Sequence, residues 1–164
     1  MKQRGFTVVE LIITITIMGI LLLVTVVNVN ATQAAARDDE RRSDVESLAL
    51  HLETFYTNGR DGTTMFGRYS STGLTTSGVS SIKDNLRDID LKSVMAPGIT
   101  DPLQTLIMAP DNTPQNPTKD QYIYQPLQAD GSLCTSGGQY CTKFIIYYRT
   151  EVDNAVHTVL SKNQ

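Results

Sequence analysis

The sequence predicts an α+β protein in which a long N-terminal α-helix packs on a small antiparallel β-sheet headpiece. Neither glycine nor proline interrupts residues 31–56, whereas the last third of the chain is rich in aromatic and β-branched residues. Residues 6–29 form an apolar run of a length that suits a membrane. We therefore expect four parts, listed here in chain order: a short basic segment at 1–5, an apolar transmembrane helix at 6–29, its amphipathic continuation at 30–57, and a headpiece at 58–164.

The apolar segment from Phe6 to Val29 follows two cations, Lys2 and Arg4, and contains one carboxylate, Glu10. As a helix it would be about 36 Å long, which crosses a hydrocarbon core of about 30 Å with some tilt. The cations hold the amino terminus on the cytoplasmic side. A carboxylate in hydrocarbon costs about 2.5 to 3.5 kcal/mol, so Glu10 is expected to have a cationic partner.

Residues 2–21, KQRGFTVVELIITITIMGIL, resemble the class III signal of type IV pilins and pseudopilins. The resemblance combines a short basic leader, Gly5, Phe6, a glutamate four residues later and an unbroken apolar helix. It implies that a prepilin peptidase cuts between Gly5 and Phe6 and methylates the new amino terminus. It also implies that Glu10 pairs with the Phe6 amine of a neighbouring subunit during assembly. Many major pilins have a kink-forming proline where this chain has Val27, so a pseudopilin and a proline-free pilin both stay open.

The resemblance further implies a homo-oligomer, a helical filament that buries residues 6–29 against the same segment of other copies. Besides the prepilin peptidase, the implied partner is an inner-membrane assembly platform with a cytoplasmic ATPase. Such filaments support adhesion, twitching motility or DNA uptake, and a subunit passes from the membrane to the cell surface. Gly19 is also expected to contribute to assembly. Helix propensity is poor between Gly19 and Asn30, and part of this stretch is expected to unwind in the filament.

Two other interpretations of the N-terminal segment stay open. The first is an ordinary signal peptide on a secreted binding domain, because Val29-Asn30-Ala31 and Ala34-Ala35-Ala36 both satisfy the small-residue rule for signal peptidase. The length of the apolar run and the presence of Glu10 are atypical of such a signal. The second is a plain anchor, with Glu10 near the cytoplasmic interface and stabilised by the helix dipole. The mature amino terminus distinguishes the three.

The helical pattern continues beyond the apolar segment. Val45, Leu48, Leu52 and Phe55 recur at helical spacing. One helix over residues 6–57 would be about 78 Å long, so its second half projects from the membrane and packs its apolar stripe on the sheet.

The charged run at residues 37–44 has two interpretations. As a solvated face, it would pair Asp38 and Asp39 with Arg42, each pair being worth a few tenths of a kcal/mol. Alternatively, some of these charges contact neighbouring subunits. Charge reversal at Arg41 and Arg42 tests the second interpretation.

Beyond the long helix the elements are short. Residues 58–81 are rich in Gly, Ser and Thr and are expected to form an irregular surface connection. Ser81 is expected to open a helix with Ile82, Leu86 and Ile89 on one face and a stop at Pro97-Gly98. The remaining expected elements are a short one from Asp101-Pro102 through Met108, and strands at 122–124, 144–148 and 156–160, the last two joined by a turn at Asp153-Asn154.

Cys134 and Cys141 have a spacing compatible with a disulfide that closes a loop between strands, two unpaired thiols being the alternative. Closing a loop of eight residues stabilises the fold by about 2.5 kcal/mol in the chain-entropy model. Two cysteines without nearby histidines make a poor metal site. The resemblance agrees, since many pilins carry a C-terminal disulfide loop.

The sequence predicts no catalytic residue, metal site or cofactor. His51 and His157 are far apart and fit neither a His-Glu-x-x-His helix nor a catalytic triad. Asp88, Asp90 and Asp101 do not have the spacing of a calcium loop. The formal net charge of -3 argues against broad affinity for nucleic acid and leaves open a local patch. The cations that a local patch would recruit are Arg60, Arg68, Lys83, Arg87 and Lys92.

Overall fold

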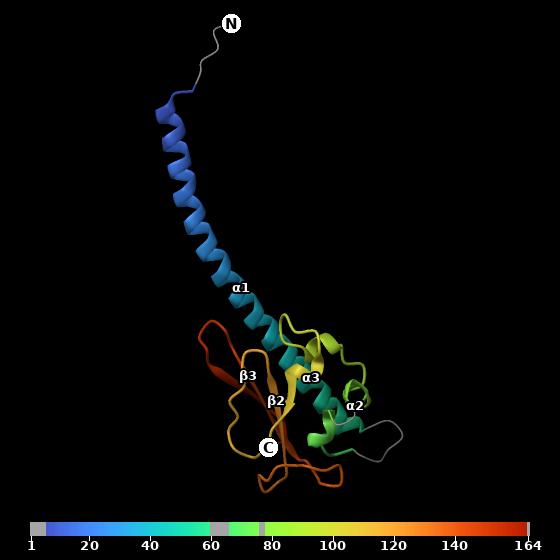
Figure 1. Cartoon of the computed structure of the whole chain (residues 1–164). Helices are drawn as coiled ribbons and strands as arrows, with labels where there is room; N and C mark the ends of the chain where they lie inside the picture. Colours follow the sequence, from blue (N-terminus) through green and yellow to red (C-terminus); the bar gives the residue numbers. More distant parts are fainter. Residues whose placement is uncertain (1–5, 60–65, 76–77, 164) are drawn as a thin grey trace.

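The computed structural model describes residues 6–59, 66–75 and 78–163, so the expected leader at 1–5 lies outside the described residues. Figure 1 shows one long helix whose N-terminal half projects away from a small headpiece. The α+β class is confirmed. The elements are α1 (Val8–Asn58), the 3-10 helix η1 (Thr72–Thr75), α2 (Val79–Asn85), the 3-10 helix η2 (Leu91–Val94), α3 (Pro102–Thr105), β1 (Leu106–Met108), β2 (Tyr122–Leu127), β3 (Lys143–Arg149) and β4 (Val156–Leu160).

Both ends of α1 have identifiable caps. Thr7 precedes the helix and forms a capping box with Glu10, in which each side chain accepts a hydrogen bond from the other residue's backbone amide, at 3.2 and 2.9 Å. Gly59 ends the helix with a φ of 71°, and its amide donates to the carbonyl of Phe55 at 2.7 Å. The helix matches the expected bounds to within about two residues at each end.

The apolar stripe on the second half of α1 forms the core, as the sequence predicts. Val45, Leu48 and Leu52 are fully buried, together with aromatic and aliphatic side chains of the sheet such as Tyr124 and Phe144. Each such side chain stabilises the fold by about 1.5 to 3 kcal/mol. A smaller cluster of Ala109, Ile123 and Tyr147 is a second, separate core.

The sheet has the order β1-β2-β3-β4, and its last three strands are antiparallel, as expected. The prediction of a wholly antiparallel sheet is wrong at one edge, where β1 pairs parallel with β2, Leu106 opposite Tyr122. The connection at 109–121 carries the chain back along the sheet before β2 begins, which makes this pairing parallel. The turn expected at Asp153-Asn154 is present, and Asn154 has a φ of 54°.

The short helices differ from the expected bounds. α2 begins at Val79 rather than Ser81 and ends at Asn85, long before Pro97-Gly98. The chain turns at Asp88, which has a φ of 60°, so Ile89 is buried without belonging to the helix. The element expected from residue 101 to 108 is two elements, α3 followed directly by β1.

The connection at 58–81 is more than a surface loop. Residues 60–65 and 76–77 of it lie outside the described residues. Within the described part, Leu74 of η1 is fully buried and Tyr69 is almost so. The amide of Tyr69 donates to the carbonyl of Cys141 at 2.7 Å, which ties this connection to the C-terminal part of the chain. Isolated apolar residues in a Gly/Ser/Thr-rich stretch have no periodicity from which burial could be predicted.

Candidate assembly helix and its junction with the headpiece

The first half of α1 exposes apolar side chains on every side. Phe6 is 88% exposed, and the large apolar residues from Val8 to Val24 are more than half exposed. The helix is long and apolar enough to cross a membrane, and none of its apolar window is buried inside the chain. Such a surface is stable only in lipid or against other apolar surfaces.

Three threonine hydroxyls of this half are satisfied within the helix. The hydroxyls of Thr14, Thr16 and Thr25 each donate to a backbone carbonyl three or four residues earlier, at 2.8 to 2.9 Å. In hydrocarbon an unpaired hydroxyl would cost several kcal/mol. These hydroxyls can therefore lie in a dry environment without polar partners from outside, whereas Glu10 still needs a cation.

Glu10 lies in the first turn of α1 and belongs to the capping box. Its Oε2 accepts both the amide and the hydroxyl of Thr7, each at 2.9 Å. Both bonds end on the same oxygen, so Oε1 has capacity for a donor from another group. Phe6, the residue before the cap, is fully described, whereas Gly5 lies outside the described residues. A Cβ added at Gly19 would meet no atom within 4 Å, so the helix surface is open there.

The prokaryotic N-terminal methylation motif matches residues 1–26. The chain carries the class III signal of type IV pilins and pseudopilins. The motif supports a membrane-anchored pilin- or pseudopilin-like precursor, and in general it implies processing by a prepilin peptidase and assembly into a filament. The motif ends within the first half of α1. Neither the curated proteins nor the solved structures give a match.

Where the pilin signal helix enters the headpiece, the charged run forms a partly buried ionic cluster. The Arg41 side chain is 1% exposed, and it donates from Nε to the carbonyl of Lys119 at 2.9 Å and from Nη1 to Asp38 at 2.7 Å. Asp38 also accepts the backbone amides of Glu151 and Val152, at 2.7 and 2.9 Å. The interpretation of this run as a solvated face is therefore wrong for Asp38 and Arg41.

A second arginine completes this cluster, which we call the Arg41 cluster and define as Arg37, Asp38, Arg41 and Glu151. Arg37 donates to both oxygens of Glu151, at 2.9 and 2.7 Å. These bonds, with the charges of Arg37 and other cations, lower the pKa of Glu151 to about 2. The cluster thus fixes the β3–β4 loop to α1 at the base of the headpiece.

The expected pairing within the run is only partly as predicted. Asp38 contacts Arg41 in place of Arg42, because Arg41 faces the headpiece on the same side as Val45. Asp39 lies close enough to Arg42 to help raise the pKa of that guanidinium, although the main cause is a hydrogen bond with Tyr148. The sequence contained a signal for the buried arginine, since residue 41 continues the spacing of the apolar stripe.

Asp44 is a buried carboxylate one turn further along α1. The hydroxyl of Tyr122 donates to its Oδ2 at 3.2 Å. Burial raises the pKa of Asp44 to about 6, more than the hydrogen bond lowers it. At the protein surface near Asp44, Lys92 of η2 forms an ion pair with Glu40 at 3.1 Å.

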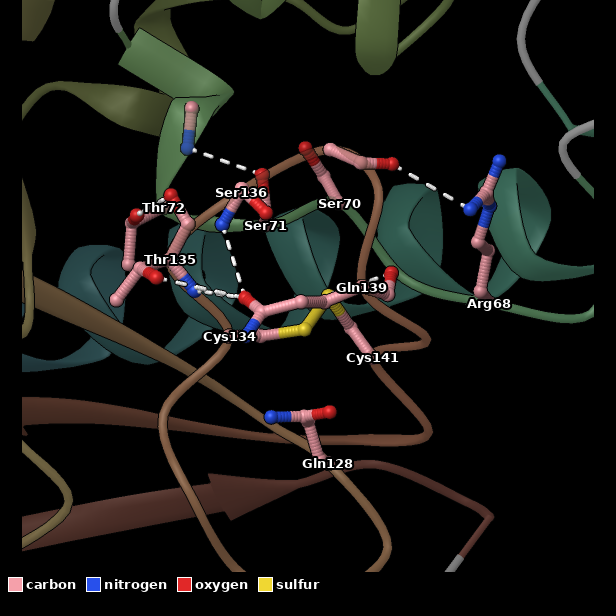
Figure 2. Close-up of a disulfide and its surroundings, with 12 residues drawn as sticks. Arg68, Ser70, Ser71, Thr72, Gln128, Cys134, Thr135, Ser136, Gln139 and Cys141 are labelled. Atoms are coloured by element: carbon pink, nitrogen blue, oxygen red, sulfur yellow. Dashed lines mark hydrogen bonds between the residues drawn. A yellow bond between two sulfur atoms is a disulfide. The ribbon is translucent and has the colours of Figure 1, made fainter.

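At the far end of the headpiece, Cys134 and Cys141 form the expected disulfide, so the alternative of two thiols is excluded. Figure 2 shows that the bridge closes a loop against the segment that carries Ser70 to Thr72. Within the loop, Gln139 Oε1 accepts the amides of Thr135 and Ser136, at 2.7 and 3.0 Å. A hollow of about 410 Å³ lies between this loop and the α2 region.

The remaining polar candidates have structural partners. Nδ1 of His51 lies 2.8 Å from the carbonyl of Ser47, and the His157 ring stacks on Tyr148. Asp90 caps η2 and Asp101 caps α3, which explains two of the three aspartates considered for calcium. Within the described residues, no group of three or more His, Cys, Asp and Glu could hold a metal ion. Arg60, considered for a nucleic-acid patch, lies outside the described residues.

Proposed function

We propose that this chain is a structural subunit of a type IV pilus or a related filament. The prepilin peptidase hydrolyses the bond between Gly5 and Phe6, releases the leader and methylates the new amine of Phe6. The observation that carries the proposal is the methylation motif at residues 1–26 on a helix that exposes apolar side chains all round. Residues 6–29 leave the lipid and pack against the same segment of other copies.

Cleavage supplies the cation that Glu10 lacks in the precursor. The new amine on Phe6 remains protonated after a single methylation, so it keeps its positive charge. We propose that it donates to Oε1 of Glu10 in an adjacent copy, since Thr7 occupies the other oxygen. Neutralising the carboxylate removes most of the cost of burying it in an apolar core, about 2.5 to 3.5 kcal/mol. Gly19 allows close helix approach in the same core.

The Arg41 cluster adds a mechanical role to the headpiece. It holds the β3–β4 loop against α1 where the apolar half of the helix ends and the headpiece begins. Because each copy holds its headpiece in the same orientation to α1, packing the helices in a regular array places the headpieces in a regular array too. The filament would then serve adhesion, twitching motility or DNA uptake at the cell surface, with its energy supplied by the cytoplasmic ATPase of the assembly platform.

A second candidate is a pseudopilin of type II secretion. It is favoured by Val27 in place of a proline and by the backbone of α1, which is helical throughout Val8–Asn58. The unwinding expected after Gly19 concerns the assembled filament and stays a prediction. Deleting the gene separates the two candidates, because loss of a pilus subunit removes or alters surface fibres whereas loss of a pseudopilin blocks protein secretion.

Mass spectrometry of the subunit in sheared fibres tests the main proposal. We expect a chain that begins at Phe6 and carries one methyl group. A Glu10→Val variant should be cleaved normally and accumulate in the membrane but fail to form fibres. Fibres whose subunits retain Met1, or normal fibres from the valine variant, would contradict the proposal. A mature chain that begins near Thr32 would support the secreted binding domain instead.

A further inference from the structure

The two edge strands of the described sheet, β1 and β4, differ in how they are covered. β1 packs against η1 and α3, and these two elements cover this edge of the sheet. β4, residues Val156–Leu160, is the opposite edge and contains no charged residue, proline or glycine. Natural proteins usually protect a free edge strand with one of these, because its unpaired backbone groups attract another chain. The composition of β4 suits an edge that a partner covers.

A groove with exposed apolar walls runs between β4 and α1. Its volume is about 350 Å³, and its walls include Leu50 of α1 and Leu160, which are 58% and 49% exposed. Two carboxylates and one cation, Lys162, line it. Glu53 already accepts the Tyr69 hydroxyl and the Lys162 amide. Glu46 is the exposed acid of this groove, near the guanidinium of Arg42. The groove therefore suits an apolar or aromatic side chain accompanied by a cation.

The headpiece carries such a pair at its far end. Tyr140, beside the disulfide, is 68% exposed, and the guanidinium carbon of Arg68 lies 5.2 Å from the centre of its ring. Arg68 also donates to the carbonyl of Gly137 at 3.4 Å, and Figure 2 shows Arg68 beside the disulfide-bonded loop. Tyrosine and arginine are enriched at the energetic centres of protein interfaces.

We propose that the Tyr140–Arg68 pair of one copy docks into the α1–β4 groove of a second copy. The ring packs between Leu50 and Leu160, and the guanidinium approaches Glu46. The inference rests on the proposed filament and names a contact between its headpieces. Since the two patches differ and every copy carries both, the contact is head-to-tail and propagates without closing into a dimer.

The direction of the shift that docking requires agrees with the helix packing proposed above. Arg68 borders the same hollow as Phe55, whereas Glu46 lies nine residues earlier, about 13 Å along the helix axis. Docking therefore shifts the second copy away from the membrane end relative to the first. Pairing Glu10 of the first copy with Phe6 of the second requires a shift in the same direction.

A charge swap in the full chain, expressed with its own assembly machinery, tests the contact. Arg68→Glu and Glu46→Lys should each lower the yield of sheared fibres about tenfold, because each places like charges in the interface. The double variant should recover to within about twofold of the wild type. Lys83→Glu, which reverses an exposed cation on α2, is the matched control and should leave the yield unchanged.

Each variant is also assayed for membrane accumulation, cleavage and disulfide formation. If Arg68→Glu does not accumulate as an oxidised subunit, Leu50→Glu on the other patch tests the same contact and should lower the yield by a similar factor. Normal fibres from Arg68→Glu or from Leu50→Glu would overturn the docking and leave the filament role intact. The same conclusion would follow if the single variants fold but give few fibres and the double variant does not restore the yield. Absence of the chain from wild-type fibres would instead overturn the filament role.

Discussion

Replacing Arg41 with methionine is expected to lower the free energy of unfolding of the headpiece by about 3 kcal/mol. Methionine keeps most of the buried aliphatic volume but removes the bonds to Asp38 and to the carbonyl of Lys119, and the contact with Glu151 at 3.5 Å. Breaking a buried ion pair typically costs about 3 to 5 kcal/mol. The lower end applies because Asp38 keeps two amide donors and Glu151 keeps its pair of bonds with Arg37.

Urea denaturation of the full chain in detergent micelles measures this loss. Near-ultraviolet circular dichroism follows the headpiece through its tyrosines, because the chain has no tryptophan. Arg42→Met is the matched control, since it removes an exposed arginine from the same turn and should cost less than about 1 kcal/mol. Equal losses for the two variants, or a loss below about 1 kcal/mol for Arg41→Met, would refute the structural role of the cluster.

Two further predictions concern the pH dependence and the disulfide. Burial raises the pKa of Asp44 to about 6, so the Asp44 carboxyl of the folded chain keeps a proton that it loses near pH 4 in the unfolded chain. The free energy of unfolding therefore falls as pH rises from about 4 to 6. Asp44→Asn, which can still accept from Tyr122, should be about 3 kcal/mol more stable than the wild type at pH 8 and equally stable at pH 3.5, as measured by urea denaturation. An equal difference at both pH values would contradict this prediction. Replacing Cys134 and Cys141 together with alanine should lower the unfolding free energy by about 2.5 kcal/mol. Reducing the wild type with dithiothreitol should reproduce most of that loss, and an unchanged urea midpoint would contradict the role of the bridge.

The structure also changes how the charged run should be tested for contacts between subunits. Charge reversal at Arg41 would disrupt the headpiece of a single copy, because that side chain is buried in its own chain. Arg42 is exposed and is the more informative position. An effect of Arg42→Glu on fibres, with stability retained, would favour the interpretation in which these charges contact neighbours.

Some features could be predicted because neighbouring residues encode them. Glu10 lies three residues after Thr7, which is the spacing of a capping box, and the stripe from Val45 to Phe55 repeats at the helical period. The disulfide was predicted from the spacing of two cysteines and from the expectation that the headpiece is exported. The three main strands were recognisable from runs of β-branched and aromatic residues.

Other features depend on residues that meet only after folding. The parallel pairing of β1 is decided by the path of the chain over residues 109–121, and three residues are too few to show a strand period. The bonds that bury Arg41 come from residues 119 and 151, far away in sequence. Leu74 is buried only because η1 packs against α2, β1 and β2, in a stretch whose composition indicates a surface loop.

The sequence by itself determined that an apolar helix with one acid near its start follows a basic leader, because hydrophobicity, charge and helical spacing are properties of adjacent residues. Only the tertiary structure decided which charges are buried at the base of the headpiece and which apolar side chains remain exposed along β4. Those outcomes depend on long-range packing. Arg37 and Asp38, for example, both bond to Glu151, which is more than 100 positions away.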